Sequence, residues 1–311
     1  MRIIDPLQKM GAKISATNKE NPPLKISPST GLIGITYKMP IASAQVKSSI
    51  LLAGLNAEGK TQVQEKYPTR DHTERMMKTF EANISFSKGI VEIEKSDLKT
   101  PGQIEVPGDF SSAAFFIGAC LISEDSEIKI KNVGINKTRK AFLDCLLDMN
   151  ANIDLTNIRQ LGNEEVADLV IKSSDLLPAK IMEDIVPNLI DELPLFFLIA
   201  SLIEGESEFN GLSELKHKES DRLSIMINNL QKLDVEVQLN EDCLKIIGKK
   251  DRIFSDEVFD SHGDHRIAMT MLVAGLRSTE GLTITNVECI NTSFPEFIDQ
   301  AKTLGFSFKN G

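Results

Sequence analysis

The sequence predicts an α/β protein that is built from tandem repeats and organised in two domains. Four times along the 311 residues, an apolar helix pattern leads into a short strand, a charged loop, an amphipathic helix and another strand. The apolar patterns begin near residues 42, 109, 190 and 264, and their amphipathic partners end alike at residues 80–84, 149–153, 233–237 and 304–308. Repeats of this length imply a tandem architecture, and the chain length fits about two domains.

The two helix types of each repeat differ in polarity. Residues 50–55 and 271–276 are apolar on nearly all faces, which is typical of a helix buried inside a domain. Residues 138–147 are apolar on one side only, with charges between, as in a surface helix. The alternating segments 61–64 and 127–131 predict half-exposed strands. We therefore expect buried helices, surface helices and strands in every repeat.

Proline and glycine punctuate residues 100–108, which we interpret as the seam between the domains. The prediction is a first domain at residues 1–107 and a second at 108–311. A fifth amphipathic pattern, at residues 6–14, has no apolar helix before it. The first domain then holds one and a half repeat units against three in the second, and we expect that the chain begins inside a longer repeat array.

Composition excludes several classes of protein. A net charge of −10 argues against a nucleic-acid platform, which needs a basic stripe. The four cysteines form no Cys-x-x-Cys pair, and Cys120 and Cys145 fall in apolar helical stretches, so we expect neither disulfides nor bound metal. There is no charged-then-apolar leader, and the apolar run at 193–203 is too short to cross a bilayer. A reducing cytoplasmic location fits these features.

The strongest candidate for chemistry is the segment 218–222. Its acidic and capping residues suit a first helical turn, on which Lys218 and Arg222, four residues apart, could face one anion. Amide groups at a helix start add donors for an anion. Glu219, next to these cations, could transfer a proton. The alternative is a solvated, charge-rich helix start without chemistry.

A second candidate is the segment 261–266, at the start of an apolar helix. Two histidines and an aspartate invite a metal hypothesis, but no other cluster supplies further ligands, and we predict no metal. A more natural use is that Arg266 grips an anion at the helix N-terminus, while Asp264 caps the helix and orients its neighbours.

Two further segments open apolar helices. Asp191 is flanked by apolar residues, so it is either a general base with raised proton affinity or an N-cap. Ser43, Ala44 and Gln45 suit a phosphorylated, polyhydroxylated ligand, although Ser43 could be a simple cap. Because Ser43, Asp191 and Arg266 occupy equivalent places in different repeats, we expect several helix N-termini to converge on one anionic site.

Six stretches, taken in order, closely resemble the 5-enolpyruvylshikimate-3-phosphate (EPSP) synthase family, and they cover essentially the whole chain. They are residues 40–48, 69–76, 106–113, 190–192, 218–222 and 264–266. The resemblance implies the two-domain enolpyruvyl transferase fold, built from repeated βαβαββ units with buried helices. The family has more units than the four and a half visible here, so the chain resembles a C-terminal portion of about 70% of a full-length member.

The resemblance also implies a reaction. Family members are 3-phosphoshikimate 1-carboxyvinyltransferases: they transfer the enolpyruvyl group of phosphoenolpyruvate to the 5-hydroxyl of shikimate 3-phosphate and release phosphate, on the route to chorismate and aromatic amino acids. Proton addition at the vinyl carbon and attack by the hydroxyl give a tetrahedral intermediate. No cofactor or metal is implied. The implied partners are these two small molecules, and the full-length enzyme is expected to be a monomer.

By the same resemblance, Asp191 would take the hydroxyl proton, and Glu219 would handle the proton at the vinyl carbon. Lys218 would contact the shikimate phosphate and the reacting hydroxyl region. Arg222 and Arg266 would hold phosphoenolpyruvate, for which paired guanidinium groups are suited. The remaining implied contacts are to the shikimate phosphate by Ser43, Ala44 and Gln45, with Gln45 also reaching the second substrate and Arg70 lining the cleft.

Two departures from the family pattern stand out. The N-terminal Lys-Ser and Arg motifs, a Gly-rich stretch and a further anion-binding Arg have no counterpart in this sequence, and Thr292 stands where many members have Lys. Ser43–Gln45 resembles a glyphosate-tolerant subgroup, but the sequence does not determine tolerance. Two alternatives stay open: a UDP-N-acetylglucosamine enolpyruvyl transferase, and an inactive or split fragment that needs an N-terminal partner.

Overall fold

The computed structural model describes residues 2–17 and 21–309. The chain divides into two compact units, each with its own hydrophobic core. The first comprises Met1–Val106 together with Gln160–Glu164, and the second comprises Pro107–Arg159 and Glu165–Gly311.

The division lies beside the predicted seam, but the prediction was wrong for residues 160–164, which it placed in the second domain. These residues form the tip of the hairpin of β10 (Asn152–Leu161) and β11 (Glu164–Lys172). Asn163 explains their grouping with the first unit, since its carbonyl accepts from Arg75 Nη1 at 2.8 Å and its Nδ2 donates to Thr79 Oγ1 at 2.7 Å. The sequence pattern gave no sign of these contacts.

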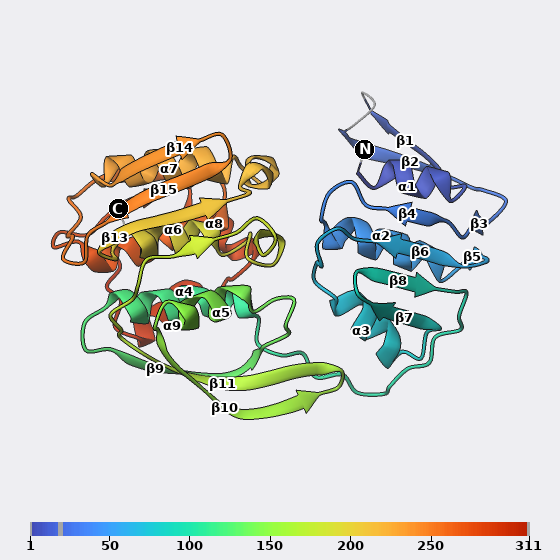
Figure 1. Cartoon of the computed structure of the whole chain (residues 1–311), viewed down its shortest axis with the longest axis horizontal. Helices are drawn as coiled ribbons and strands as arrows, with labels where there is room; N and C mark the ends of the chain where they lie inside the picture. Colours follow the sequence, from blue (N-terminus) through green and yellow to red (C-terminus); the bar gives the residue numbers. More distant parts are fainter. Residues whose placement is uncertain (1, 18–20, 310–311) are drawn as a thin grey trace. The chain divides into compact units, whose positions relative to one another are not determined.

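The helices and strands of the first unit are, in chain order, α1 (Ile4–Lys9), β1 (Lys13–Thr17), β2 (Asn21–Ser27), β3 (Leu32–Ile33), β4 (Thr36–Lys38), α2 (Ala44–Gly54), β5 (Ala57–Glu58), β6 (Thr61–Gln64), α3 (His72–Thr79), β7 (Ile84–Ser87) and β8 (Ile90–Ile93). One sheet has the strand order β4-β6-β8-β7, in which β4 is parallel to β6 and β8 is antiparallel to both of its neighbours. With α2 joining β4 to β6 and α3 joining β6 to β7, this is one complete βαβαββ unit (Figure 1).

The second unit contains α4 (Phe110–Ile122), β9 (Glu127–Gly134), α5 (Ala141–Asp148), β10, β11, β12 (Lys180–Ile181), η1 (Val186–Asn188), α6 (Leu193–Ser201), β13 (Gly205–Asn210), η2 (Ser213–His217), α7 (Arg222–Lys232), β14 (Glu236–Asn240), β15 (Cys243–Gly248), β16 (Val258–Asp260), α8 (His265–Ala274), η3 (Gly275–Arg277), β17 (Thr283–Thr285), η4 (Val287–Thr292) and α9 (Phe297–Thr303), where η denotes a 3₁₀ helix. Its sheet β12-β13-β15-β14 repeats the order and strand directions of the β4-β6-β8-β7 sheet.

The other two sheets of the second unit follow the same scheme. Gly108 forms a parallel bridge to Val133 across α4, and β9 continues into the order β9-β11-β10. The strands β16 and β17 are parallel and are joined through α8. The predicted fold of repeated α/β units is thus confirmed, and in each of these units the first helix follows a strand or bridge, with η1 between β12 and α6.

Three of these first helices form the core of the second unit. Helices α4, α6 and α8 contact one another, and every residue of α6 is buried (Figure 1). Their pattern of apolar residues on all faces predicted this burial. By contrast, α7 buries one face, chiefly Leu223, Met226 and Leu230. Cys120 and Cys145 are buried, as their apolar helical surroundings predicted.

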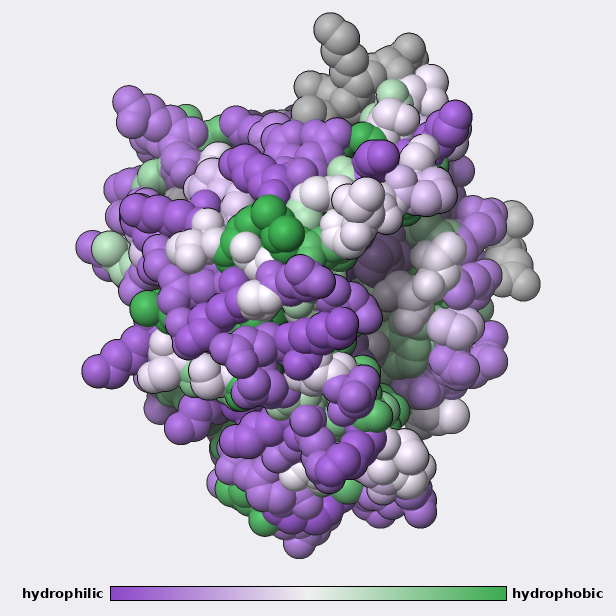
Figure 2. Space-filling view, turned by 90° about the vertical axis from the view of Figure 1, so that its right-hand side faces the viewer, coloured by the Kyte–Doolittle hydropathy of each residue, from purple (hydrophilic) through white to green (hydrophobic). Residues whose placement is uncertain are grey.

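Hydrophilic side chains predominate on the face drawn in Figure 2, and the apolar ones there form separate small groups. Within the described ranges, no helix is long and apolar enough to cross a membrane.

Candidate functional site

The best-defined charged cluster of the second unit surrounds the guanidinium of Arg222, the first residue of α7. Only 1% of the Arg222 side chain is exposed, and three carboxylates surround it. Its Nε donates to Asp264 Oδ2 at 2.8 Å, its Nη2 to Glu219 Oε2 at 2.5 Å, and its Nη1 to Asp191 Oδ1 at 3.4 Å. The structure therefore brings three predicted site residues, Asp191, Glu219 and Arg222, into one cluster.

The helix start in this cluster differs from the prediction. We placed residues 219–221 in the first turn, with Lys218 and Arg222 on one side of it. Instead, Asp221 is the N-cap, accepting from Ser224 N at 3.0 Å, and the helix begins at Arg222. Lys218 has extended backbone (φ −88°, ψ −159°) at the end of η2, and its side chain is half-buried. The prediction that Lys218 and Arg222 lie on one side of the first helical turn is thus wrong, because the cap lies three residues later than the pattern implied.

The start of α8 contributes Asp264 and, next to it, His265. Asp264 is fully buried and caps α8 by accepting from Arg266 N at 2.9 Å, as predicted. Burial alone would raise the pKa of Asp264, but the charge of Arg222 and hydrogen bonds from Arg222, Arg266 N and Ser220 hold it below its ordinary value. Burial and the neighbouring charge of Arg266 lower the pKa of His265.

Arg266 reaches from α8 toward the start of α6. Its Nη1 donates to the Asp191 carbonyl at 3.0 Å and lies 3.5 Å from Glu192 Oε1, while its Nη2 lies 4.0 Å from Asp191 Oδ2. The side chain of Arg266 is 12% exposed and that of Asp191 is 13% exposed. Both groups thus retain some access to solvent, which a substrate-binding cation and a base require.

Asp191 does not cap α6, so the capping alternative for it is wrong. The N-cap position belongs to Glu192, whose side chain makes no capping hydrogen bond. The Asp191 carboxylate instead faces Arg139 Nη2, Arg222 Nη1 and Arg266 Nη2, at 4.0, 3.4 and 4.0 Å. A carboxylate that lies among three cations and is partly reachable from solvent can act as a proton acceptor.

Sequence reasoning missed two members of the cluster, Arg139 and Glu192. The Glu192 carboxylate is 1% exposed and forms a two-bonded pair with Arg139, Nη1 to Oε2 at 2.9 Å and Nη2 to Oε1 at 3.0 Å. Ser111, in the first turn of α4, donates to Glu192 Oε1 at 2.5 Å. One signal in the sequence could have found them. Glu192 directly precedes an apolar helix, and a charge that is buried there needs a partner of opposite charge.

The site residues predicted in the first unit lie at the starts of α2 and α3. Ser43 caps α2, with its Oγ accepting from Val46 N at 3.4 Å. Ala44, half-buried, and Gln45, exposed, are in the first turn of α2, and Arg70 is half-buried just before α3. Capping by Ser43 is confirmed, and the ligand contacts of these residues stay predictions.

An unpredicted ion cluster lies deeper along α2. Lys47 is 1% exposed, and its Nζ lies 3.0 Å from Glu65 Oε2 and 2.7 Å from Glu74 Oε1. Lys47 Nζ also donates to the Thr69 carbonyl at 3.4 Å. Burial raises the pKa of Glu74, although the charge and hydrogen bond of Lys47 act against this. The cluster ties α2 to α3 and to the segment that leads to Arg70.

The described residues contain no group of three or more His, Cys, Asp or Glu side chains that could hold a metal ion. Thr292, at the end of η4, donates through Oγ1 to the Cys289 carbonyl at 2.7 Å, which gives it a local structural contact.

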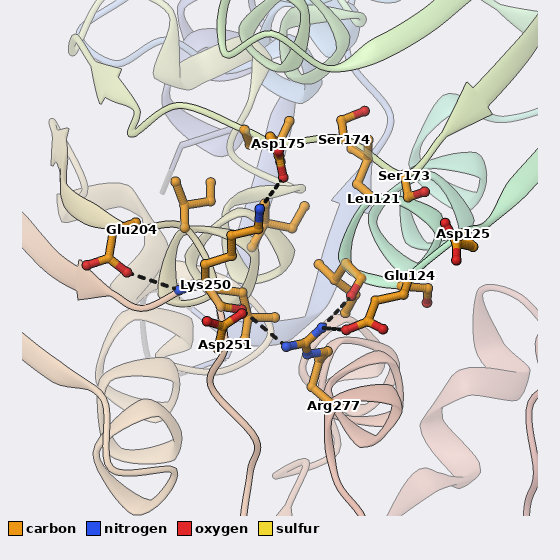
Figure 3. A pocket seen from close by; sticks show the side chains of 16 residues that line it. Leu121, Glu124, Asp125, Ser173, Ser174, Asp175, Glu204, Lys250, Asp251 and Arg277 are labelled. Carbon is orange, nitrogen blue, oxygen red and sulfur yellow. Dashed lines mark hydrogen bonds and ion pairs between the residues drawn. The ribbon is translucent and has the colours of Figure 1, made fainter.

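A cavity of about 510 Å³ also lies in the second unit, but it contains none of the predicted site residues. Figure 3 shows that its cations are already engaged. Lys250 Nζ lies 2.5 Å from Asp175 Oδ1, and Arg277 donates to the carbonyls of Ile122, Lys250 and Arg252. The cluster around Asp191 is therefore the better candidate for a functional site.

Comparison with known proteins yields a consistent set of relatives. The family profile described as EPSP synthase (3-phosphoshikimate 1-carboxyvinyltransferase) matches residues 1–301. Proteins named 3-phosphoshikimate 1-carboxyvinyltransferase from Hydrogenovibrio crunogenus and Geotalea uraniireducens are 44% and 45% identical over 98% and 96% of this chain. The chain covers 70% and 69% of their lengths.

Solved structures give the same picture. An EPSP synthase from Acinetobacter baumannii matches with a TM-score of 0.87 and 41% identity, over 98% of this chain and 70% of that one. The enolpyruvyl transferase NikO from Streptomyces tendae matches with a TM-score of 0.78 at 16% identity, covering 98% of this chain and 71% of its own, which indicates a shared fold only.

Proposed function

The chain belongs to the EPSP synthase (3-phosphoshikimate 1-carboxyvinyltransferase) family, and we propose that it transfers the enolpyruvyl group of phosphoenolpyruvate to the 5-hydroxyl of shikimate 3-phosphate, releasing phosphate. One observation carries the proposal beyond family membership. The partly exposed Asp191 carboxylate lies within 4.0 Å of the guanidinium groups of Arg139, Arg222 and Arg266. A carboxylate base that lies beside several cations suits a reaction between two anionic substrates.

In this proposal Asp191 takes the proton of the attacking hydroxyl. Its carboxylate lies beside three guanidinium groups and is reachable from solvent. Glu219, 56% exposed, handles the proton at the vinyl carbon of phosphoenolpyruvate. General acid–base catalysis of this kind contributes about 10²- to 10⁴-fold to a rate.

Arg222 and Arg266 are proposed to bind phosphoenolpyruvate. Arg222 is enclosed by three carboxylates, and of these only Glu219 is largely exposed. We therefore propose that Glu219 releases Arg222 Nη2 when the anionic substrate arrives, which also frees Glu219 for proton transfer. Lys218 is proposed to contact the shikimate phosphate, since it is half-buried and directly precedes Glu219.

Ser43, Ala44, Gln45 and Arg70 are proposed to contribute the remaining contacts to shikimate 3-phosphate and phosphoenolpyruvate. Amide groups in the first turn of α2 support this for residues 43–45, because a helix N-terminus favours a phosphate. Electrostatic positioning by these groups requires no cofactor. Cytoplasmic location, and a monomeric state when full length, stay predictions.

The test is phosphate release from phosphoenolpyruvate by the purified chain, measured with and without shikimate 3-phosphate. We expect release that depends on shikimate 3-phosphate and that falls about 10²- to 10⁴-fold in Asp191→Asn. Release that persists at the parent rate in Asp191→Asn would contradict the assignment of the base.

A second arm addresses the alternative that the chain is a fragment that needs an N-terminal partner. The chain covers about 70% of its relatives' lengths, so the assay is repeated with the unmatched part of one relative added. Release only after addition would support a split or truncated synthase, and release by the chain alone would contradict that need.

The alternative acceptor, UDP-N-acetylglucosamine, is tested in the same assay. The relatives reported above carry the name of the shikimate enzyme, which favours shikimate 3-phosphate. Faster release with the nucleotide sugar would overturn the proposed substrate.

A further inference from the structure

The Glu192 carboxylate is bound from three elements of the second unit. Arg139, just before α5, donates twice to it, Ser111 of α4 donates once, and Arg266 of α8 lies 3.5 Å from Oε1. These partners lie 53, 81 and 74 residues away along the chain. The Glu192 carboxylate thus connects the starts of α4, α6 and α8. Arg139 contributes from the residues just before α5.

Asp191 is the residue directly before this anchored carboxylate. Arg139 and Arg266, which both contact Glu192, also place an Nη2 atom 4.0 Å from Asp191 Oδ2. Arg222 approaches the other oxygen from α7, at 3.4 Å, and its remaining donors contact Asp264 and Glu219. Glu192 thus contacts two of the three cations around the Asp191 carboxylate, Arg139 and Arg266, and the surroundings of Asp191 depend on where it holds them.

We propose that Arg139 and Glu192 are positioning residues, which hold the Asp191 carboxylate and the Arg266 guanidinium at the spacing that the reaction requires. The inference rests on the proposed function, in which Asp191 is the base and Arg266 binds phosphoenolpyruvate. Neither Arg139 nor Glu192 needs to touch a substrate, since the side chains of both are at least nine-tenths buried.

A contribution to stability does not by itself explain the buried ion pair of Arg139 and Glu192. A buried ion pair often contributes no more than well-packed apolar side chains would. The two-bonded geometry of Arg139 instead fixes the plane of the Glu192 carboxylate, because a guanidinium presents its donors in a rigid fork. With that plane fixed, Oε1 lies 3.5 Å from Arg266 Nη1, and the same Nη1 donates to the Asp191 carbonyl at 3.0 Å.

The kinetic test compares Arg139→Lys with Arg277→Lys. Arg277 is a matched control, since its guanidinium is mostly buried and donates to three backbone carbonyls near the cavity of Figure 3. Lysine keeps the charge in both variants but loses the fork. We expect kcat to fall about 100-fold in Arg139→Lys, more than the KM for phosphoenolpyruvate changes, and to stay unchanged in Arg277→Lys.

A second readout does not depend on activity. The titration of the Asp191 side-chain carboxyl is followed by carbon-13 NMR, with Asp191→Asn used for assignment. Arg139→Lys should shift the Asp191 titration to higher pH, because a lysine that contacts Glu192 cannot also keep a donor where Arg139 Nη2 lies. Glu192→Gln should shift it to lower pH, because Arg139 and Arg266 lose their shared counter-charge.

Opposite shifts in the two folded variants, together with the loss of kcat in Arg139→Lys, would support a positioning role. Unchanged Asp191 titration in folded Arg139→Lys and Glu192→Gln, or an equal shift in Arg277→Lys, would overturn the inference. If the parent protein releases no phosphate in either arm of the activity assay, the proposed function fails, while the titration still decides whether Arg139 and Glu192 position Asp191.

Discussion

Arg222 Nε and Asp264 Oδ2 lie 2.8 Å apart in the interior of the second unit, where the two side chains are 1% and 0% exposed. The pair connects the first residue of α7 to the N-cap of α8, 42 residues later. Ser220 Oγ donates to the same carboxylate oxygen at 2.9 Å. The arginine proposed to bind substrate is therefore held in place by a charge that no substrate can displace easily.

Replacing Asp264 by Asn should destabilise the protein by about 3–5 kcal/mol, because the charge that compensates buried Arg222 is lost while the cap is kept. The measurement is chemical unfolding at neutral pH. Asp221→Asn is the matched control, since Asp221 is also an N-cap but is exposed. An equal, small effect of the two substitutions would show that Asp264 acts only as a cap.

Stability should decrease as the pH falls below about 6.5, partly through His265. Burial and the Arg266 charge lower the pKa of His265 below the ordinary value of 6.5. The unfolded chain then binds a proton at a higher pH than the folded protein does, so acid favours unfolding. Unfolding free energies measured between pH 7 and pH 5 should depend less on pH in His265→Asn. An unchanged slope would contradict this assignment.

Glu219→Gln should lower kcat by about 10²- to 10⁴-fold, if Glu219 handles the proton at the vinyl carbon. The KM for phosphoenolpyruvate should change little or decrease, because the carboxylate that contacts Arg222 Nη2 loses its charge. Steady-state kinetics separate the two effects. Asp221→Asn again serves as control, as it removes a nearby exposed charge, and a similar loss of kcat in it would argue for a general electrostatic effect.

Lys47→Met should cost about 3–5 kcal/mol of stability, because it leaves the buried carboxylates of Glu65 and Glu74 without their shared cation. Glu74→Gln should cost less, since Lys47 keeps Glu65 as a counter-charge. Thermal and urea unfolding of both variants provide the comparison. A larger cost for Glu74→Gln would mean that Lys47 is balanced chiefly by Glu74.

Gly248→Ala should destabilise the protein strongly, because the new Cβ would lie 2.1 Å from the Ile203 carbonyl oxygen and 2.2 Å from that of Ala200. These are backbone atoms at the end of α6, which cannot move independently of the helix. Gly275→Ala is the control, since its Cβ would meet nothing within 4 Å and its φ of −56° suits alanine. We expect Gly275→Ala to be neutral or stabilising by up to about 1 kcal/mol. Equal stability of the two variants would contradict the packing described here.

Much of the fold could be predicted because its signals are local. The run Leu193–Ser201 is apolar on every side, and a helix of this kind avoids water only inside a domain. Ser43 and Asp264 cap helices because a side-chain oxygen can satisfy an amide two or three residues away. Such features depend on neighbours in the chain, which the sequence displays directly.

The candidate site was predicted only in part. The sequence indicated Asp191, Glu219, Arg222 and Arg266, and the structure brings all four into one cluster of the second unit. It did not indicate Arg139 or Glu192, and it placed Lys218 in a helix that starts only at Arg222. A cap three residues further along was compatible with the same residue types, so the local pattern did not decide between the two starts.

By itself, then, the sequence determined the repeated α/β units, the burial of their first helices and the family to which the chain belongs. Only the tertiary structure decided which charges meet: Arg139 with Glu192, Arg222 with Asp264, and Lys47 with Glu65 and Glu74. The physical reason is that polarity patterns repeat over a few residues, whereas an ion pair needs two groups within 4 Å. For residues 18 to 53 positions apart, only the packing of helices and strands can bring that about.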